Sequence, residues 1–344
     1  MAGLPRNKII NPKEPGIFHC WSRCVRRAFL CGKDRYSRKD YEYRRNWIEE
    51  RLEHLARWFA IDIAFFAILQ NHFHLVLRTL PQLVVKWSNK QVVKRSCQIF
   101  PTKFKEMGVK DGVPTGEQVR KFAANRKLVN ELRSRLSDPS WFLRQLKQNI
   151  AARANAEEGK SGHFFEGRFR CKAVTDEMGI LICGVYVDLN QIRAGEAGSV
   201  KESRRTSAYR RLQGLLARRQ KKRGAAAWDG FLCPLQARGD GQAAGYAKAG
   251  TRDGQRASDR GLLEMSLEDY LQVLDWVGRQ TRRDKRGRIA AQAPPILDQV
   301  GLDGEKLLTF VEDFEDLFRH AVGRPAAVQE FTDNLRSAAV KRQG

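Results

Sequence analysis

The chain has few histidines and few acidic residues, and it lacks the long apolar runs that cross membranes. Only 6 of its 344 residues are His, and 39 Asp and Glu stand against 63 Lys and Arg, a formal net charge of +24. No stretch approaches the ~20 apolar residues of a membrane-spanning helix, and residues 1–10 lack the apolar core of a signal peptide. We therefore expect an intracellular protein without a membrane partner, whose positive charge favours nucleic acid as its ligand.

The sequence also lacks the regularly spaced cysteines of a disulfide framework. The seven cysteines are an odd number spread over a large chain. His19, Cys20, Cys24 and Cys31 lie close enough to suggest a zinc cluster, but no second Cys-x-x-Cys completes the four ligands. The sequence has no internal repeat and no phosphate-binding glycine loop of the P-loop or dinucleotide kind.

The apolar content, 42 % of residues, is ample for cores, and its periodicity predicts an alternation of strands and helices. Strands are expected at 17–25, 61–69, 72–78 and 168–174, the middle two joined as a tight antiparallel hairpin. Helices are expected at 38–59, 84–100, 118–136, 141–156 and 176–193, the last capped by Asp176. This order predicts an α+β sandwich built on a central antiparallel sheet.

The composition changes beyond Ser203. Arginine pairs at 204–205 and 210–211 and a basic run at 218–223 are followed by Gly- and Ala-rich sequence to about residue 260, and residues 213–260 are interpreted as a basic linker. Apolar residues at helical spacing follow Ser266 and recur at 306–320, which predicts a small helical C-terminal domain over 261–344.

Two histidines, His72 and His74, are separated by one apolar residue in a predicted strand. Side chains alternate along a strand, so both imidazoles leave the same face and could bind one cation. Two half-exposed histidines at the edge of a core strand would give the same pattern.

Tyr186 and Asn190 are four residues apart on the predicted helix 176–193 and therefore share a face. If this helix packs beside the hairpin, His72, His74 and Asn190 could hold a divalent ion, with Tyr186 next to an open position. Tyr186 would then attack a phosphate, and a proton acceptor that the sequence does not identify would be needed. The alternative is that the Tyr186 ring simply packs in the core.

Three separated motifs together resemble the single-tyrosine HUH transposases, in particular the REP-associated tyrosine transposases. They are Asn-His-Phe-His-Leu-Val-Leu at 71–77, Gly-His-Phe-Phe-Glu-Gly-Arg-Phe at 162–169, and Tyr-Val-Asp-Leu-Asn-Gln-Ile-Arg-Ala-Gly at 186–195. The resemblance spans residues 15–212, including Arg-Cys-Val-Arg-Arg at 23–27. Residues 80–140 stand out as a helical insertion. Gln70 and Gln191 replace prolines that the family often has.

The resemblance implies a ferredoxin-like sandwich of the HUH endonuclease type in which His72, His74 and Asn190 bind Mg²⁺ or Mn²⁺. Tyr186 would cut single-stranded DNA beside a hairpin, leaving a 5'-phosphotyrosine and a free 3'-OH for strand transfer. The protein would be cytoplasmic, bacterial and nucleoid-associated. A monomer is plausible, and a homodimer stays open.

Basic residues on the strands near the proposed site are expected to contact the DNA backbone, namely Arg23, Arg168, Arg170 and Lys172. Trp21 and Phe164 could stack on bases or belong to the core. A hairpin-binding regulator that no longer cleaves DNA is the main alternative function. A rolling-circle initiator is a third, but neither a helicase segment nor a second catalytic tyrosine is visible.

Overall fold

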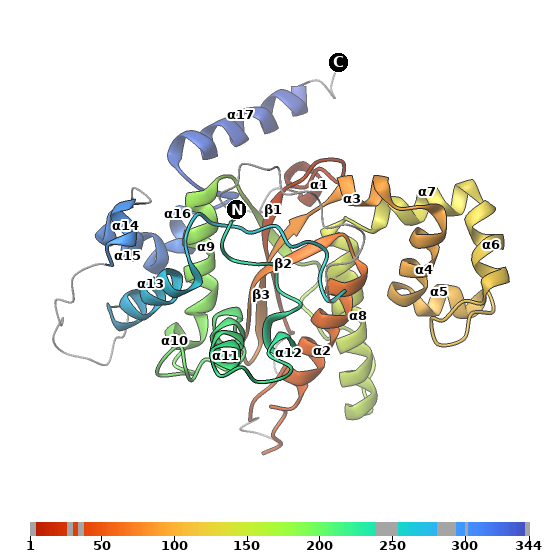
Figure 1. Cartoon of the computed structure of the whole chain (residues 1–344), viewed down its shortest axis with the longest axis horizontal. Helices are drawn as coiled ribbons and strands as arrows, with labels where there is room; N and C mark the ends of the chain where they lie inside the picture. Colours follow the sequence, from red (N-terminus) through yellow and green to blue (C-terminus); the bar gives the residue numbers. More distant parts are fainter. Residues whose placement is uncertain are drawn as a thin grey trace.

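The computed structural model describes residues 5–25, 30–33, 38–237, 254–280, 294–299 and 302–340. One five-stranded sheet lies between two layers of helices, so the predicted α+β class is confirmed (Figure 1). The strand order is β2-β3-β1-β4-β5. The strands are β1 (Ile17–Arg23), β2 (Ile61–Ile68), β3 (His72–Thr79), β4 (Arg170–Val174) and β5 (Ala321–Val322).

The first four strands pair antiparallel, as predicted, and β5 adds a parallel edge beside β4. Sequence patterns did not predict β5, because two residues are too short to show alternation. The predicted β2–β3 hairpin is confirmed, with the backbone N–H of Leu69 donating to the carbonyl of His72 across 2.9 Å. The more specific ferredoxin-like form stays a prediction.

Helices α2 (Arg44–Trp58) and α8 (Pro139–Glu158) lie over one face of the sheet, and the apolar side chains of Phe18, Phe73 and Leu75 belong to this core. Helix α2 begins at Arg44, six residues later than its pattern predicted, because residues 38–43 form a bridge and a turn instead. The buried guanidinium of Arg44 pairs with two carboxylates at the end of α8, which ties the two helices together.

Residues 80–140 are helical, as the sequence predicted, and α4 to α7 extend to one side of the molecule (Figure 1). Two helices expected to be continuous are each divided, because Ser88 and Asn125 cap new helices there with their side chains. The five helices are α3 (Pro81–Lys86), α4 (Asn89–Ile99), α5 (Pro101–Glu106), α6 (Gly116–Ala124) and α7 (Arg126–Arg135).

Helix α9 (Glu177–Asp188) covers the opposite face of the sheet and carries Tyr186. Asp176 caps it as predicted, with its Oδ1 accepting from the N–H of Gly179 across 2.7 Å. Gly184 lets the helix approach β2 closely, since a Cβ there would come within 2.6 Å of the Phe65 ring. The helix ends at Asp188, before the predicted Arg193, and a separate turn, α10 (Asn190–Arg193), follows Leu189.

The C-terminal helices share their core with α9. Tyr270 and Leu274 of α13 (Leu267–Gln280), Leu307 of α15 (Gly304–Glu312) and Phe314 of α16 (Phe314–Leu317) are buried in the same apolar cluster as α9. The other helices are α1 (Arg6–Ile9), α11 (Ser207–Arg219), α12 (Ala226–Asp229), α14 (Ile296–Gln299) and α17 (Pro325–Val340).

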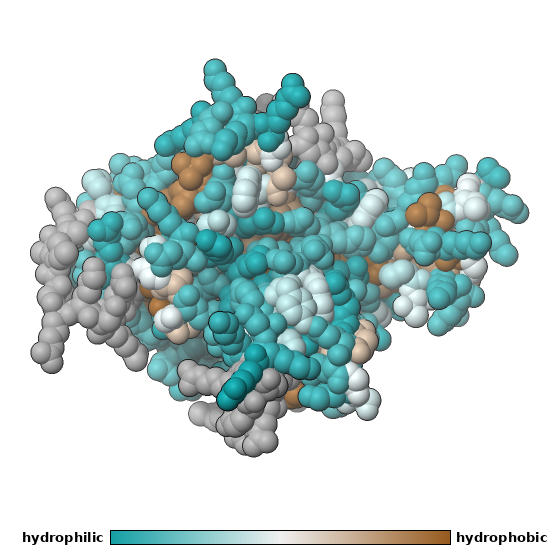
Figure 2. Space-filling model, turned by 90° about the horizontal axis from the view of Figure 1, so that it is seen from below, coloured by the Kyte–Doolittle hydropathy of each residue, from teal (hydrophilic) through white to brown (hydrophobic). Residues whose placement is uncertain are grey.

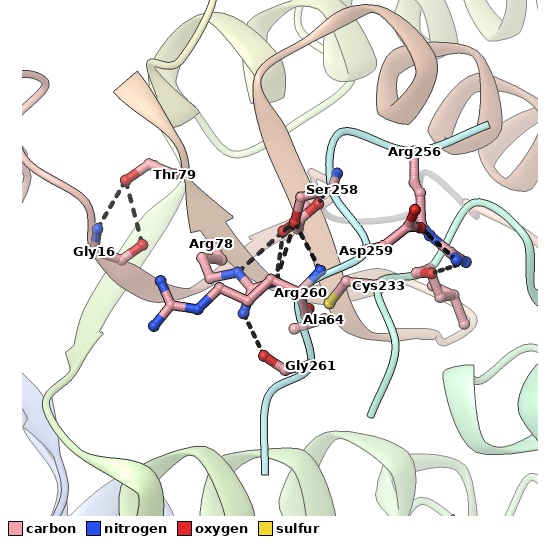
Figure 3. A network of polar contacts seen from close by, with 12 residues as sticks. Gly16, Ala64, Arg78, Thr79, Cys233, Arg256, Ser258, Asp259, Arg260 and Gly261 are labelled. Atoms are coloured by element: carbon pink, nitrogen blue, oxygen red, sulfur yellow. Dashed lines mark hydrogen bonds and ion pairs between the residues drawn. The ribbon is translucent and has the colours of Figure 1, made fainter. Parts of the chain in front are cut away.

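The segment interpreted as a linker, residues 213–260, includes the end of α11 and all of α12, and residues 238–253 of it lie outside the described residues. Its last described part is bonded to the sheet (Figure 3). Arg78 of β3 donates to the carbonyls of Arg260 and of the adjoining Gly261, the latter across 2.7 Å. Ser258 donates to the buried Asp62 carboxylate across 2.6 Å. Asp62 in turn accepts from Arg78, so the network is closed by a buried ion pair.

The surface seen in Figure 2 is predominantly hydrophilic, with hydrophobic residues in small separate areas. Within the described ranges, no helix combines the length and apolarity that crossing a membrane requires.

Candidate active site

Alternation along β1 and β3 brings His72 and His74 to the face of the sheet that α9 covers. Trp21 lies opposite His74 and Arg23 opposite His72 in the antiparallel register. The two imidazoles are 5.0 Å apart between ring centroids, so the predicted pair does share a face. A cavity of about 280 Å³ opens here, lined by Trp21, Ser22, Arg23, His72, His74, Glu166, Arg168, Arg170, Tyr186 and Glu315.

Both imidazoles use Nδ1 for a hydrogen bond within the protein. His72 Nδ1 lies 2.6 Å from Asn71 Oδ1, and His74 Nδ1 lies 2.9 Å from His19 Nε2. Burial lowers the pKa of His72 to about 4, with Arg23 adding to the effect, and burial also lowers the pKa of His74 strongly. The rings are therefore neutral at pH 7, with Nε2 of each left as the atom that can bind a cation.

The imidazole of His19 is hydrogen-bonded to that of His74, a contact that the sequence patterns did not predict. It is fully buried on β1, two residues before Trp21, and stacks on His74 at 5.1 Å. When His74 donates a hydrogen bond from Nδ1 to His19, its Nε2 carries no proton and is free for a ligand. A hydrogen bond that orients the ring in this way is typical of metal-binding histidines. The β1 alternation could have placed His19 on this face, but it gave no sign of the pairing.

Tyr186 of α9 lines the cavity, although the residue is only 5 % exposed. The ring stacks on Phe314 with centroids 3.9 Å apart and meets the edge of His74 at 5.8 Å. The hydroxyl donates to Glu315 Oε1 across 3.1 Å. Burial, followed by the negative charge of Glu315, raises the pKa of Tyr186 well above its usual value, and Arg193 opposes this shift.

Asn190 begins the short helix α10, one turn after Tyr186, and is not part of the cavity lining. Its side-chain amide donates to the backbone carbonyl of Tyr186 across 3.4 Å. A hydrogen bond with the Asn190 side chain also lowers the pKa of Tyr186, so the amide lies near the tyrosine hydroxyl, as expected for residues four apart on one helical face. The role of Asn190 as a metal ligand stays a prediction.

The two imidazoles suit two positions around a divalent ion, with water or phosphate oxygen as further ligands. Over the ranges that the structure describes, no group of three or more His, Cys, Asp or Glu side chains is placed to hold a metal. The chain thus supplies a neutral pair of nitrogen donors beside Tyr186, which fits a site completed by water or substrate rather than a closed structural one.

Three of the four predicted DNA contacts line the cavity. Arg23, Arg168 and Arg170 are exposed, and none forms an ion pair with any residue in the described segments. Lys172 differs from them, because its side chain is buried and its Nζ pairs with Glu315 Oε2 across 2.9 Å. The exposed guanidinium groups leave the rim of the cavity free to bind an anion.

The loop that carries Arg168 is attached to the end of β1. The N–H of Val25 donates to the carbonyl of Phe164 across 3.1 Å, and the N–H of Glu166 donates to the backbone carbonyl of Arg23 across 2.9 Å. Phe164 is buried, whereas Trp21 lines the cavity, so only Trp21 of the two proposed stacking residues is available to a base. Arg26 and Arg27 of the early basic motif lie outside the described residues.

A second cavity of about 350 Å³ adjoins the first through Arg168. Its lining includes Arg6, Arg144 and Lys147 with the rings of Trp141 and Phe169, and no carboxylate. Burial lowers the pKa of Lys147 to about 8, and repulsion from Arg6 contributes. Because no carboxylate lines this cavity, a phosphate bound in it would be attracted by all of these positive charges.

No family model matches the chain, and no curated protein matches it. Among solved structures, the chain is similar to a REP-associated tyrosine transposase bound to a REP hairpin. The identity is 12 %, the match covers 56 % of this chain and 76 % of that one, and the TM-score is 0.32.

Proposed function

We propose that this chain is a metal-dependent endonuclease and strand transferase that cuts single-stranded DNA beside hairpins. The observation that supports this most directly is one cavity that gathers a neutral imidazole pair, a tyrosine hydroxyl and three exposed arginines. The arginines would hold the phosphates on either side of the cut, and Trp21 would stack on a neighbouring base.

In the proposed reaction, the Tyr186 oxygen attacks phosphorus and the bond from phosphorus to the 3' oxygen breaks. The 5' phosphate then remains on Tyr186, and a free 3'-OH is released. Since the phosphodiester energy is kept in the phosphotyrosine bond, a second 3'-OH can attack it and the strands can be rejoined. His72 and His74 would hold Mg²⁺ or Mn²⁺, which when bound supplies a positive charge that stabilises the negative charge gathering on the phosphate oxygens.

The first test is the formation of a covalent protein–DNA adduct. Purified protein is incubated with 3'-labelled single-stranded hairpins taken from the flanks of its own gene, with Mg²⁺, with Mn²⁺ and with EDTA. We expect a labelled adduct on denaturing gels that requires the divalent ion and is absent from Tyr186→Phe. That variant removes only one oxygen, so its hairpin binding, measured by fluorescence anisotropy, should match that of the wild type.

A second candidate function is that of a hairpin-binding regulator without cleavage. The burial of the Tyr186 ring under Phe314, together with its raised pKa, favours this alternative. The same experiment separates the two, because a regulator would bind the hairpins tightly and form no adduct with either metal.

A further inference from the structure

The carboxylate of Glu315 lies between the tyrosine hydroxyl and a buried lysine. Its Oε1 accepts from Tyr186 across 3.1 Å, and its Oε2 pairs with Lys172 Nζ across 2.9 Å. The Lys172 side chain is 3 % exposed and the Glu315 side chain 51 % exposed. One oxygen is thus fixed by an enclosed cation, and the other is directed at the atom that would attack the phosphate.

The neighbouring residue holds Glu315 in this position. Phe314 is fully buried and stacks on the Tyr186 ring within 13° of parallel. It also contacts His19 and lies 4.7 Å from the Lys172 ammonium. Because Phe314 is anchored in the core shared with α9, the backbone of α16 cannot shift freely and the Glu315 carboxylate is kept at the hydroxyl.

Other groups in the cavity are less suited to take a proton from Tyr186. His74 meets the tyrosine ring only by its edge, and its Nδ1 is already bonded to His19. Glu166, in the loop before β4, also lines the cavity, but within the described segments its carboxylate forms no hydrogen bond with Tyr186. Glu315 is therefore the acid–base group in hydrogen-bond contact with the nucleophile.

We propose that Glu315, supplied by the C-terminal helices, is the catalytic base that accepts the Tyr186 proton. This inference rests on the proposed function. As the bond from the tyrosine oxygen to phosphorus forms, the O–H bond breaks and its proton moves to Glu315 Oε1. The bond from phosphorus to the 3' oxygen breaks with its electron pair on oxygen, which takes a proton from water. Glu315 then releases its proton to solvent, so one proton passes in net from Tyr186 to the 3'-OH.

The charges around Glu315 favour a proton transfer that occurs together with the attack of the tyrosine oxygen on phosphorus. A free phenolate beside the Glu315 carboxylate would bring two negative charges together, which is unfavourable. When Glu315 takes the proton, its charge is lost and the positive charge of Lys172 is left to face the new phosphotyrosine. In the rejoining step the incoming 3'-OH loses its proton to water as it attacks phosphorus. The tyrosine oxygen leaves phosphorus and takes a proton from Glu315, which has first regained one from solvent.

The test compares Glu315→Gln and Glu315→Ala with Asp316→Asn and Asp316→Ala in the full chain. Asp316 is the next residue of α16, is exposed and lies outside the cavity, so it is a matched control. The initial rate of adduct formation is measured on one labelled hairpin over a series of Mn²⁺ concentrations. Hairpin affinity and thermal unfolding are recorded for every variant to confirm that each is folded.

We expect both Glu315 variants to form adduct about 100-fold more slowly at saturating Mn²⁺, a typical loss for general-base catalysis. The Asp316 variants should keep the wild-type rate, and the half-saturating Mn²⁺ concentration should not change. Added formate, which can enter the space left by the side chain, should accelerate Glu315→Ala but not Glu315→Gln. A structural role would not produce this rescue.

Two results would overturn the inference while leaving the proposed function intact. One is a wild-type rate in Glu315→Gln. The other is a normal rate at saturation with a raised half-saturating Mn²⁺ concentration, which would make Glu315 a metal ligand instead. If the wild type itself forms no adduct, the proposed function fails and the role of Glu315 fails with it.

Discussion

At the scale of single residues, the site depends on imidazoles that are kept neutral by burial. His72, His74 and His19 form a chain across β3 and β1 in which each ring touches the next. Burial lowers the pKa of all three, because a charged ring would lose its hydration in this enclosed part of the sheet. The same shift that prepares them to bind a cation makes the fold sensitive to acid.

The pKa of His72 predicts the direction of that sensitivity. Its folded value of about 4 is below the ordinary value of about 6.5, so the unfolded chain takes up the proton first as the pH falls. The free energy of unfolding should therefore decrease between pH 6.5 and about 4 by at most about 3 kcal/mol from this group. Urea unfolding of the wild type and His72→Gln in EDTA measures it, and a difference between them that does not change with pH would contradict the assignment.

At the scale of elements, α9 is positioned by glycines as much as by its apolar residues. Gly179 packs against the backbone that connects β5 to α17. A Cβ at Gly179 would come within 2.3 Å of the Val322 carbonyl oxygen. Gly184 packs in the same way against the ring of Phe65 on β2. The helix that carries Tyr186 is thus held close to both the sheet and the C-terminal segment, since larger residues would separate them.

We expect Gly179→Ala to lower the free energy of unfolding by about 1–3 kcal/mol, because backbone atoms must move to admit the methyl group. Gly116→Ala at the start of α6 is the matched control. A Cβ at Gly116 meets nothing within 4 Å, so that change should be neutral or stabilising by up to about 1 kcal/mol. Equal stability of the two variants in urea unfolding would show that the 322–323 backbone moves aside at little cost.

At the scale of the whole molecule, the basic residues behind the net charge of +24 fall into two groups, those paired with carboxylates and those that line the cavities. Many arginines pair with carboxylates, as Arg205 does with Glu49 and Arg210 with Glu53. The exposed arginines of the first cavity and the cations of the second form no such pairs with described acids, and Arg168 lines both. A single strand of DNA could follow this path, with its phosphates replacing the missing carboxylates.

Arg168→Gln should therefore weaken binding of a single-stranded hairpin about 5- to 10-fold at 0.1 M salt, and should lower the slope of log affinity against log salt by about 1. Arg120→Gln, an exposed arginine of α6 outside both cavities, should change neither value. Fluorescence anisotropy over a series of salt concentrations gives both quantities. An equal loss in the two variants would mean that DNA responds to net charge and not to this path.

Much of this arrangement was predictable from the sequence, because it depends on local patterns. Strand alternation placed His72 and His74 on one face, the short Gln70–Asn71 connection produced the hairpin, and the Asp176 side chain set the start of α9. The positions of Arg23 and Arg170 on predicted strands likewise placed them near the site. Each of these follows from neighbouring residues and the geometry of a strand, a helix or a turn.

Only the tertiary structure decided which distant groups meet Tyr186. Glu315 is 129 residues away from it along the chain, and no periodicity marks that residue as different from the other acids of its helix. The pairing of Lys172 with Glu315 and the turning of Asn190 toward a backbone carbonyl were equally hidden. The physical reason is that a buried charge or amide bonds to whichever partner the packing of remote elements brings near it, and local sequence does not encode that packing.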